Sequence, residues 1–355
     1  MTSPRENLLR TLRRQGFDRV PLDPNDFCPS QVEAFRRRLG NDDYMAFFGA
    51  PVRSFWVGVE PTCAEWRPLY RRETLPDDID FDAFGVGHSR HPGCHHMTQM
   101  HHPLRGEDLT LEELRRYPFP RFNPETKAVH RAFVQAQHKR GLAAMAGMAC
   151  TVWETAWYMR SMADLMADMM MDDERASVLL DKVTDLSCDR ARAAAGSGAD
   201  ILSLGDDIGM QSTIMMSQDL WRAWIKPRIA RVIAAARNEK PDILVHYHSC
   251  GYVLPFIGEL ADIGVDILNP VQPECMSFAE VHRQYGDRIS FWSTIGTQTT
   301  LPFGKPEEVK AVVRRNLEIC GAAGGIVIGP THMVEPEVPW ENLLAMKEAC
   351  EEFQA

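Results

Sequence analysis

The feature that most constrains the fold is an alternation of short apolar runs with longer amphipathic segments. The apolar runs read as buried strands, and the segments between them are long enough for helical crossovers between parallel strands. The runs that predict strands lie at 18–22, 55–59, 142–147, 200–204, 242–248, 265–269, 289–293 and 324–329. Because eight such runs alternate with helical patterns, we predict a (β/α)8 barrel, or TIM barrel.

Length alone leaves one or two domains open, since the chain has 355 residues. Barrels of this size commonly form one domain, and we expect a single barrel domain over residues 1–355. Neither GxGxxG nor GxxxxGK[ST] follows the first strand, which disfavours a doubly wound nucleotide-binding sheet. Residues 61–124 are rich in Pro, Gly, His and aromatic residues, and they predict an irregular excursion from the barrel.

Charge and cysteine usage exclude several classes of protein. The formal net charge of −10 argues against nucleic acid as a partner. No run of about 18 apolar residues predicts a membrane span, and the first residues lack the apolar core of a secretory signal. The nine cysteines show no disulfide framework, which is typical of a reducing compartment, so we expect a cytoplasmic protein.

The run at 242–248 ends in potential metal ligands. Side chains alternate between the two faces of a strand, so His246, His248 and Cys250 point the same way. Two imidazoles and a thiol on one face form a poor apolar core but a good site for zinc. The alternative is that individual members of this set are hydrogen-bonded core residues.

Other polar residues also follow predicted strands, where the active site of a barrel lies. Asp206 and Asp207 follow the strand at 200–204, and Gln211 comes a turn later; one of the two carboxylates could instead cap a helix. Glu154 follows the third strand, where burial would raise its pKa for proton transfer, although a glutamate also suits a helix start. His332 follows the last strand and is a candidate third or fourth metal ligand.

A second cluster of histidines lies within the excursion, between residues 88 and 102. His91, Cys94 and His95 have a spacing typical of metal ligands. The segment shows no strand or helix pattern to hold such ligands in place, so a cavity wall or an inter-subunit arm is the favoured interpretation over a second metal site.

Several segments together resemble a known family. They are residues 205–211, 248–251, 302–309, 324–332 and 339–346, with weaker matches at 18–21 and 102–104. On these segments the chain resembles the uroporphyrinogen decarboxylase-like superfamily, which includes cobalamin-dependent methyltransferases. The resemblance implies a (β/α)8 barrel with its site at the carboxyl ends of the strands.

The methyltransferase branch of that superfamily binds zinc through a His-x-Cys pair, which His248 and Cys250 match. A later cysteine completes the site in that branch, whereas His332 stands at the matching place here, with His246 as a further candidate ligand. The resemblance implies a methyl group moved between a small methylated compound and a corrinoid cofactor, which we expect to be carried on a separate protein. Asp207, Glu154 or Gln211 would orient the substrate or manage its proton, and a homodimer is common in the family.

Two other functions stay open at the level of sequence. A metal-independent decarboxylase would use Asp207 as its acid and would need arginines for substrate carboxylates. The arginine-rich amino-terminal signature of the true decarboxylases is absent from this chain. A non-catalytic barrel that binds a corrinoid or another ligand is the second alternative.

Overall fold

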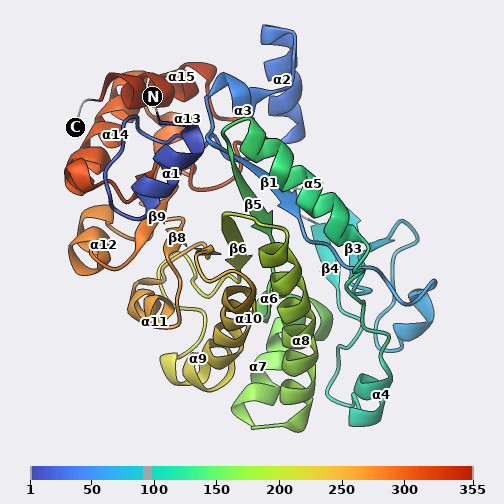
Figure 1. The fold of residues 1–355 in the computed structure, drawn as a ribbon. Helices are drawn as coiled ribbons and strands as arrows, with labels where there is room; N and C mark the ends of the chain where they lie inside the picture. Colours follow the sequence, from blue (N-terminus) through green and yellow to red (C-terminus); the bar gives the residue numbers. More distant parts are fainter. Residues whose placement is uncertain (1, 91–97, 354–355) are drawn as a thin grey trace.

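The computed structural model describes residues 2–90 and 98–353. Its centre is a sheet of parallel strands that curls toward a barrel, with helices on its outer face (Figure 1). The strands, in the order of the sheet, are β1 (Val52–Trp56), β5 (Ala143–Gly147), β6 (Ile201–Gly205), β7 (Leu244–His248), β8 (Ile267–Asn269), β9 (Ser290–Trp292) and β10 (Ile326–Val327). The predicted barrel-type α/β fold is therefore confirmed.

The first predicted strand contributes only a single bridge. Leu22 pairs in parallel with Ile328 beside β10, which gives the 18–22 segment the eighth position in the barrel. Within the described residues, no strand pairing joins this segment to β1, so the sheet is a curled, incompletely closed barrel. The predicted strand at 55–59 is placed too late, because the pairing of β1 with β5 begins at Val52 and ends at Trp56.

Two of the helical connections between strands are divided into shorter helices, α6 to α8 between β5 and β6 and α9 to α10 between β6 and β7. Ser161 has a φ of 79° and separates α6 from α7, and Pro227 lies in the first turn of α10, where a missing N–H is tolerated. The helices around the barrel are α1 (Pro4–Leu12), α2 (Pro29–Leu39), α3 (Tyr44–Phe47), α5 (Thr126–Lys139), α6 (Trp153–Arg160), α7 (Met162–Met170), α8 (Glu174–Gly196), α9 (Gln218–Trp224), α10 (Lys226–Glu239), α11 (Ile257–Asp262), α12 (Phe278–Tyr285), α13 (Thr300–Phe303), α14 (Pro306–Cys320) and α15 (Trp340–Glu352).

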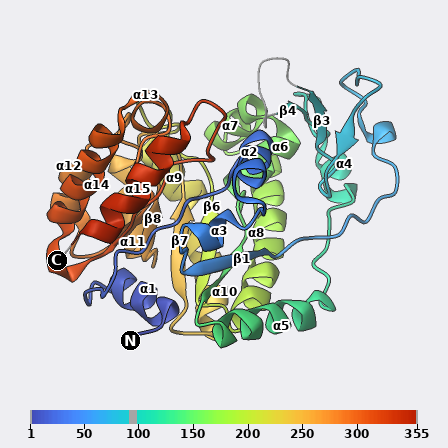
Figure 2. The same ribbon diagram turned by 90° about the horizontal axis from the view of Figure 1, so that it is seen from above.

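The excursion is more regular than its composition predicts, so the expectation of an irregular segment is wrong in part. It contains β2 (Asp80–Phe81), β3 (Gly87–Arg90) and β4 (Thr98–His101), which form an antiparallel sheet, and the helix α4 (Leu111–Arg116). Figures 1 and 2 place it beside α6–α8, away from α14 and α15. Its strands are short and polar, which explains why apolar alternation did not reveal them. His91, Cys94 and His95 lie outside the described residues.

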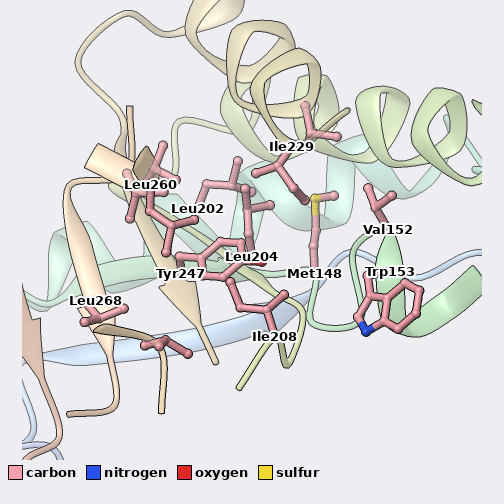
Figure 3. Close-up of a cluster of buried hydrophobic side chains, with 14 of the residues drawn as sticks. Met148, Val152, Trp153, Leu202, Leu204, Ile208, Ile229, Tyr247, Leu260 and Leu268 are labelled. Carbon is pink, nitrogen blue, oxygen red and sulfur yellow. The ribbon is translucent and has the colours of Figure 1, made fainter. Parts of the chain in front are cut away.

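The core lies between the strands and the helices that cover them (Figure 3). Leu202 and Leu204 of β6 and Tyr247 of β7 are fully buried, and Ile229 of α10 packs in the same cluster. Burial of this kind is worth roughly 1.5–3 kcal/mol for each large apolar side chain. The strands are thereby held rigidly, and so are the loops that leave their carboxyl ends. No helix in the described part of the chain is long and apolar enough to cross a membrane.

Candidate metal centre

Three side chains with metal-binding atoms meet at the carboxyl ends of β6 and β7. One ligand atom from each of Asp207, His248 and Cys250 lies within 4.8 Å of the other two. The Nε2 atom of His248 is 3.5 Å from Cys250 Sγ and 3.7 Å from Asp207 Oδ1. The side chains of His248 and Asp207 remain 29% and 34% exposed, so the group is reachable from outside. A carboxylate, an imidazole and a thiol in this arrangement could hold a borderline cation such as zinc.

His246 and His248 lie on the same face of β7, but His246 is buried deeper inside the barrel than His248. His246 is one pleat deeper than His248 and is 5% exposed. Its Nδ1 atom is 3.0 Å from Ser203 Oγ, and its ring meets the edge of Trp292. Burial lowers the pKa of His246 to about 3, so its imidazole is neutral. It lies outside the group formed by Asp207, His248 and Cys250.

The loops after β6 and β7 interlock closely, and two glycines make this approach possible. A Cβ atom at Gly209 would lie 2.8 Å from the carbonyl oxygen of Cys250, and one at Gly251 would lie 2.6 Å from that of Met210. Gly251 also has a φ of 84°, which other residues rarely adopt. The backbone N–H of Cys250 donates to Asp207 Oδ1 at 2.7 Å, which ties the carboxylate to the thiol-bearing loop.

Asn269, at the end of β8, orients His248. Its Nδ2 donates to the carbonyl oxygen of Trp292, so its Oδ1 faces His248 Nδ1 at 2.6 Å. The Nε2 atom of His248 is therefore the one that faces Cys250 and Asp207. Burial lowers the pKa of His248, but its contacts with Cys250, Asp207 and Asn269 outweigh this effect and raise the pKa to about 9. Such an outer hydrogen bond is typical of metal-binding histidines.

The two adjacent carboxylates have different roles. Asp206 is fully buried and accepts hydrogen bonds from the backbone N–H groups of Val152 and Glu154, at the start of α6. Burial raises the pKa of Asp206 well above its usual value. The helix that follows in the chain, α9, is capped instead by Ser217. Asp206 therefore caps α6, which follows the neighbouring strand β5, instead of the next helix in the chain, and Asp207 lies beside His248.

Glu154 lies in the first turn of α6 and faces the same centre. Burial, followed by the negative charge of Asp207, raises the pKa of Glu154 to about 7. The Tyr158 hydroxyl donates to Glu154 Oε1 at 2.8 Å, one helical turn later. Cys150 Sγ lies 3.6 Å from the same hydroxyl. The sequence did not single out Tyr158, although its spacing of four residues from Glu154 on a helix was a usable signal.

The remaining predicted residues lie at the mouth of the barrel. His332 is exposed, and its ring centroid lies 6.5 Å from that of His248. Gln211 and Gln298 exchange two side-chain hydrogen bonds, of 3.0 and 3.2 Å, between the loops after β6 and β9. Both Gln211 and His332 line a cavity of about 410 Å³ whose wall also includes Cys250, a volume suited to a small molecule.

A curled parallel sheet with ligand-type and ionisable side chains at its carboxyl ends defines a barrel enzyme site. The family model described as "Uroporphyrinogen decarboxylase (URO-D)" matches residues 81–353, and the chain belongs to this family. The family resemblance read from the sequence is thus confirmed.

Individual relatives carry two different names. A methylated-thiol–coenzyme M methyltransferase of Methanosarcina mazei is 28% identical over 193 residues, a match that covers 51% of this chain and 46% of that protein. This chain therefore spans only about half the length of that relative. A uroporphyrinogen decarboxylase of Coxiella burnetii is 22% identical, and the match covers 98% of this chain and 95% of that protein.

A solved structure, described as a methyltransferase from Methanosarcina mazei, superposes with a TM-score of 0.67. It is 19% identical in sequence, and the match covers all of both chains. At this level of identity the superposition establishes the shared fold.

Proposed function

We propose that the chain is a zinc-dependent methyltransferase that moves a methyl group between a small methylated compound and a corrinoid cofactor or corrinoid protein. Methoxylated compounds are the first donors to consider. The observation that carries the proposal is the group of Asp207, His248 and Cys250 at the carboxyl ends of two neighbouring strands. A decarboxylation that needs no metal gives no reason to assemble a thiol and an imidazole there.

The donor set fits zinc, since thiolate, imidazole and carboxylate are its usual ligands. Asp207, His248 and Cys250 would hold the ion through Oδ1, Nε2 and Sγ. His332 shares the cavity wall with Cys250 and is the proposed fourth ligand. The depth of His246 and its contact with Ser203 favour a role beneath the site for that residue rather than in direct ligation.

Zinc bound there would supply a Lewis acid that polarises a methoxy oxygen or lowers the pKa of a thiol. Glu154 is suited to donate or accept a proton during the reaction, because a pKa of about 7 leaves its carboxyl group partly protonated near neutral pH. Tyr158 donates to Oε1, which leaves Oε2 of Glu154 to carry the proton. Gln211 and the second carboxylate oxygen of Asp207, Oδ2, would position the substrate, and the cavity lined by Gln211 opens outward, where a corrinoid would approach the methyl group.

Decarboxylation is the second candidate, and the whole-length similarity to uroporphyrinogen decarboxylases favours it. That reaction would use Asp207 or Glu154 as the acid, without a metal. A substrate with several carboxylates needs basic groups around it. Among the described residues that line the 410 Å³ cavity, none is Arg or Lys. A non-catalytic barrel that binds a corrinoid is the third candidate, and it would show binding without turnover.

The test is a pair of activity assays on the same preparation, before and after removal of metal with a chelator. Methyl transfer from methoxylated and methylated-amine donors to free reduced cobalamin is followed by absorbance, and uroporphyrinogen decarboxylation by product analysis. We expect methyl transfer that is lost with the chelator and restored by zinc. Decarboxylation that is insensitive to the chelator, without methyl transfer, would contradict the proposal. Binding of cobalamin with no turnover of any donor would favour the third candidate.

A further inference from the structure

One buried guanidinium, on α8, has no carboxylate partner among the described residues. Arg190, on α8, is 4% exposed, and its Nε donates to the carbonyl oxygen of Val57 at 2.7 Å. Among the described residues, no Asp or Glu oxygen lies within ion-pair distance of its guanidinium. Burial lowers the pKa of Arg190 to about 10, so the side chain still carries its charge at neutral pH. An unpaired buried charge is strongly unfavourable unless something neutralises it.

A second deeply buried arginine among the described residues is neutralised by carboxylates of the chain. Arg160 is 1% exposed, and its guanidinium contacts Asp168 at 2.9 Å and Asp164 at 3.4 Å. It also donates to the carbonyl oxygens of Leu104 and Gly106. All three nitrogen atoms of the Arg160 guanidinium therefore donate hydrogen bonds. Arg190 differs because its Nε is engaged while neither Nη group has an acceptor among the described residues.

The Arg190 side chain lines a cavity of about 170 Å³ at the carboxyl ends of β1 and β5, which we call the Arg190 cavity. Its wall is formed by Trp56, Gly58, Val59, Asp82, Phe84, Val86, Ala149, Cys150, Thr155, Tyr158 and Arg190. Aromatic rings therefore surround a single cation, as expected of a pocket for a small acidic molecule with an apolar body.

The other ionisable groups of this wall do not neutralise Arg190. The Asp82 carboxylate accepts hydrogen bonds from the backbone N–H groups of Phe84 and Val86, and it lies 3.6 Å from His88 Nε2. Burial raises the pKa of the Cys150 thiol, which is therefore uncharged at neutral pH. The Tyr158 hydroxyl is directed to Glu154. Arg190 is the only Arg or Lys among the described residues of the wall.

Tyr158 connects this cavity to the metal centre. It belongs to the cavity wall, and its hydroxyl donates to Glu154 at 2.8 Å. The wall residue Ala149 also lies close to β7, because a Cβ atom on Gly205 would lie 3.8 Å from Ala149 Cα and 3.1 Å from His248 Cβ. We propose that Arg190 binds a carboxylate of the substrate, which places the acidic end of a small methylated acid in the Arg190 cavity and its methyl-bearing end toward Asp207, His248 and Cys250. The planar pair of Nη donors matches the two oxygens of a carboxylate. This inference rests on the proposed function for the identity of the ligand as substrate.

Binding is tested without turnover, by the thermal midpoint of the intact protein in acetate, sulfate and acetamide, with sodium chloride to match ionic strength. We expect a saturable rise in midpoint with acetate, little with the neutral isostere acetamide, and loss of the rise in Arg190→Met. Arg190→Lys keeps the charge and should retain part of the rise. Arg10→Met is the control, since Arg10 lies in α1 and pairs with Asp18. A rise with sulfate alone would overturn the carboxylate assignment, and no rise in the native protein would overturn the site.

The link to substrate is tested with two donors of similar size, methoxyacetate and 2-methoxyethanol. Loss of Arg190 should raise KM for the charged donor by about 10- to 100-fold, as expected for a charge-assisted hydrogen bond, and leave the neutral donor unchanged. Equal effects on both donors would contradict the assignment. If neither donor reacts while acetate still binds through Arg190, the proposed function fails and the carboxylate site stands. The reverse pattern, turnover without acetate binding, would remove the site alone.

Discussion

Buried carboxylates at the two ends of the parallel strands differ in whether basic side chains of the chain neutralise them. At the amino end of β6, Asp200 accepts hydrogen bonds from Arg5, His138 and the backbone N–H of Ala144, so the chain neutralises its own carboxylate. At the carboxyl end of the same region, Asp207 and Glu154 approach each other with no Arg or Lys in ion-pair contact among the described residues. The negative charge at the amino end is therefore neutralised by side chains of the chain. The negative charge at the carboxyl end has to be balanced by a proton or by a bound cation.

The largest effect on stability should come from breaking the self-neutralised end. Asp200→Ala would leave Arg5 and His138 without their acceptor, and breaking a buried ion pair costs about 3–5 kcal/mol. Arg5 is 34% exposed and partly solvated, so we expect about 3 kcal/mol. Unfolding in denaturant measures this loss. Metal content should be unchanged, and a parallel loss of metal would contradict the separation of the two ends.

A substitution next to the metal ligands should lower zinc affinity, unlike Asp200→Ala, which should lower stability and leave metal content unchanged. Asn269→Ala removes the acceptor that orients His248, and loss of such an outer-layer partner weakens metal affinity by roughly 10- to 100-fold. Competition with a chromophoric chelator measures zinc affinity. Asn316→Ala is a matched control, because Asn316 is a buried asparagine that bonds Thr294 instead. Equal zinc affinity in the two variants would exclude the assigned role of Asn269.

The pH dependence of stability should also distinguish the amino end. Burial raises the pKa of Asp200, but hydrogen bonds from Arg5, Ala144 and His138 outweigh burial, and the net pKa is lowered. The stabilisation is therefore present above the unfolded pKa of about 3.9, and it is lost as pH falls toward the lower folded value. The difference in unfolding free energy between the native protein and Asp200→Asn should shrink below about pH 4. A difference that is constant from pH 7 to 3 would contradict the lowered pKa.

The smallest effect is expected at the rim of the mouth. Gln211→Ala removes the exposed bridge to Gln298, and exposed substitutions usually change stability by less than about 0.5 kcal/mol. If Gln211 positions the donor, kcat/KM for methyl transfer should fall by roughly 10-fold or less, the value of one hydrogen bond. Gln284→Ala, in α12, is a control on another exposed glutamine. A fall in zinc content in Gln211→Ala would show that the rim and the metal centre are not independent.

Sequence periodicity predicted the barrel, because buried parallel strands leave a strong apolar signal. Alternation along 242–248 put His248 and Cys250 on one face, and the structure brings both close to Asp207. The cap expected from the doublet at 206–207 is different in the structure, because Asp206 accepts hydrogen bonds from the start of α6 while Ser217 caps the next helix. Depth along a strand is not visible in alternation, so His246 could not be separated from His248. The partners of Arg190 and Asn269 come from distant strands, and the short polar strands β2–β4 have no apolar pattern.

The central claim is that the chain holds a zinc ion through residues at the ends of β6 and β7. Metal analysis by plasma mass spectrometry, on protein purified without chelator, tests it most directly when the His248→Ala/Cys250→Ala double variant is measured alongside. We predict close to one zinc per chain in the native protein and loss of that zinc in the variant, with the fold retained by circular dichroism. Absence of zinc from both proteins, or equal zinc in both, would contradict the claim.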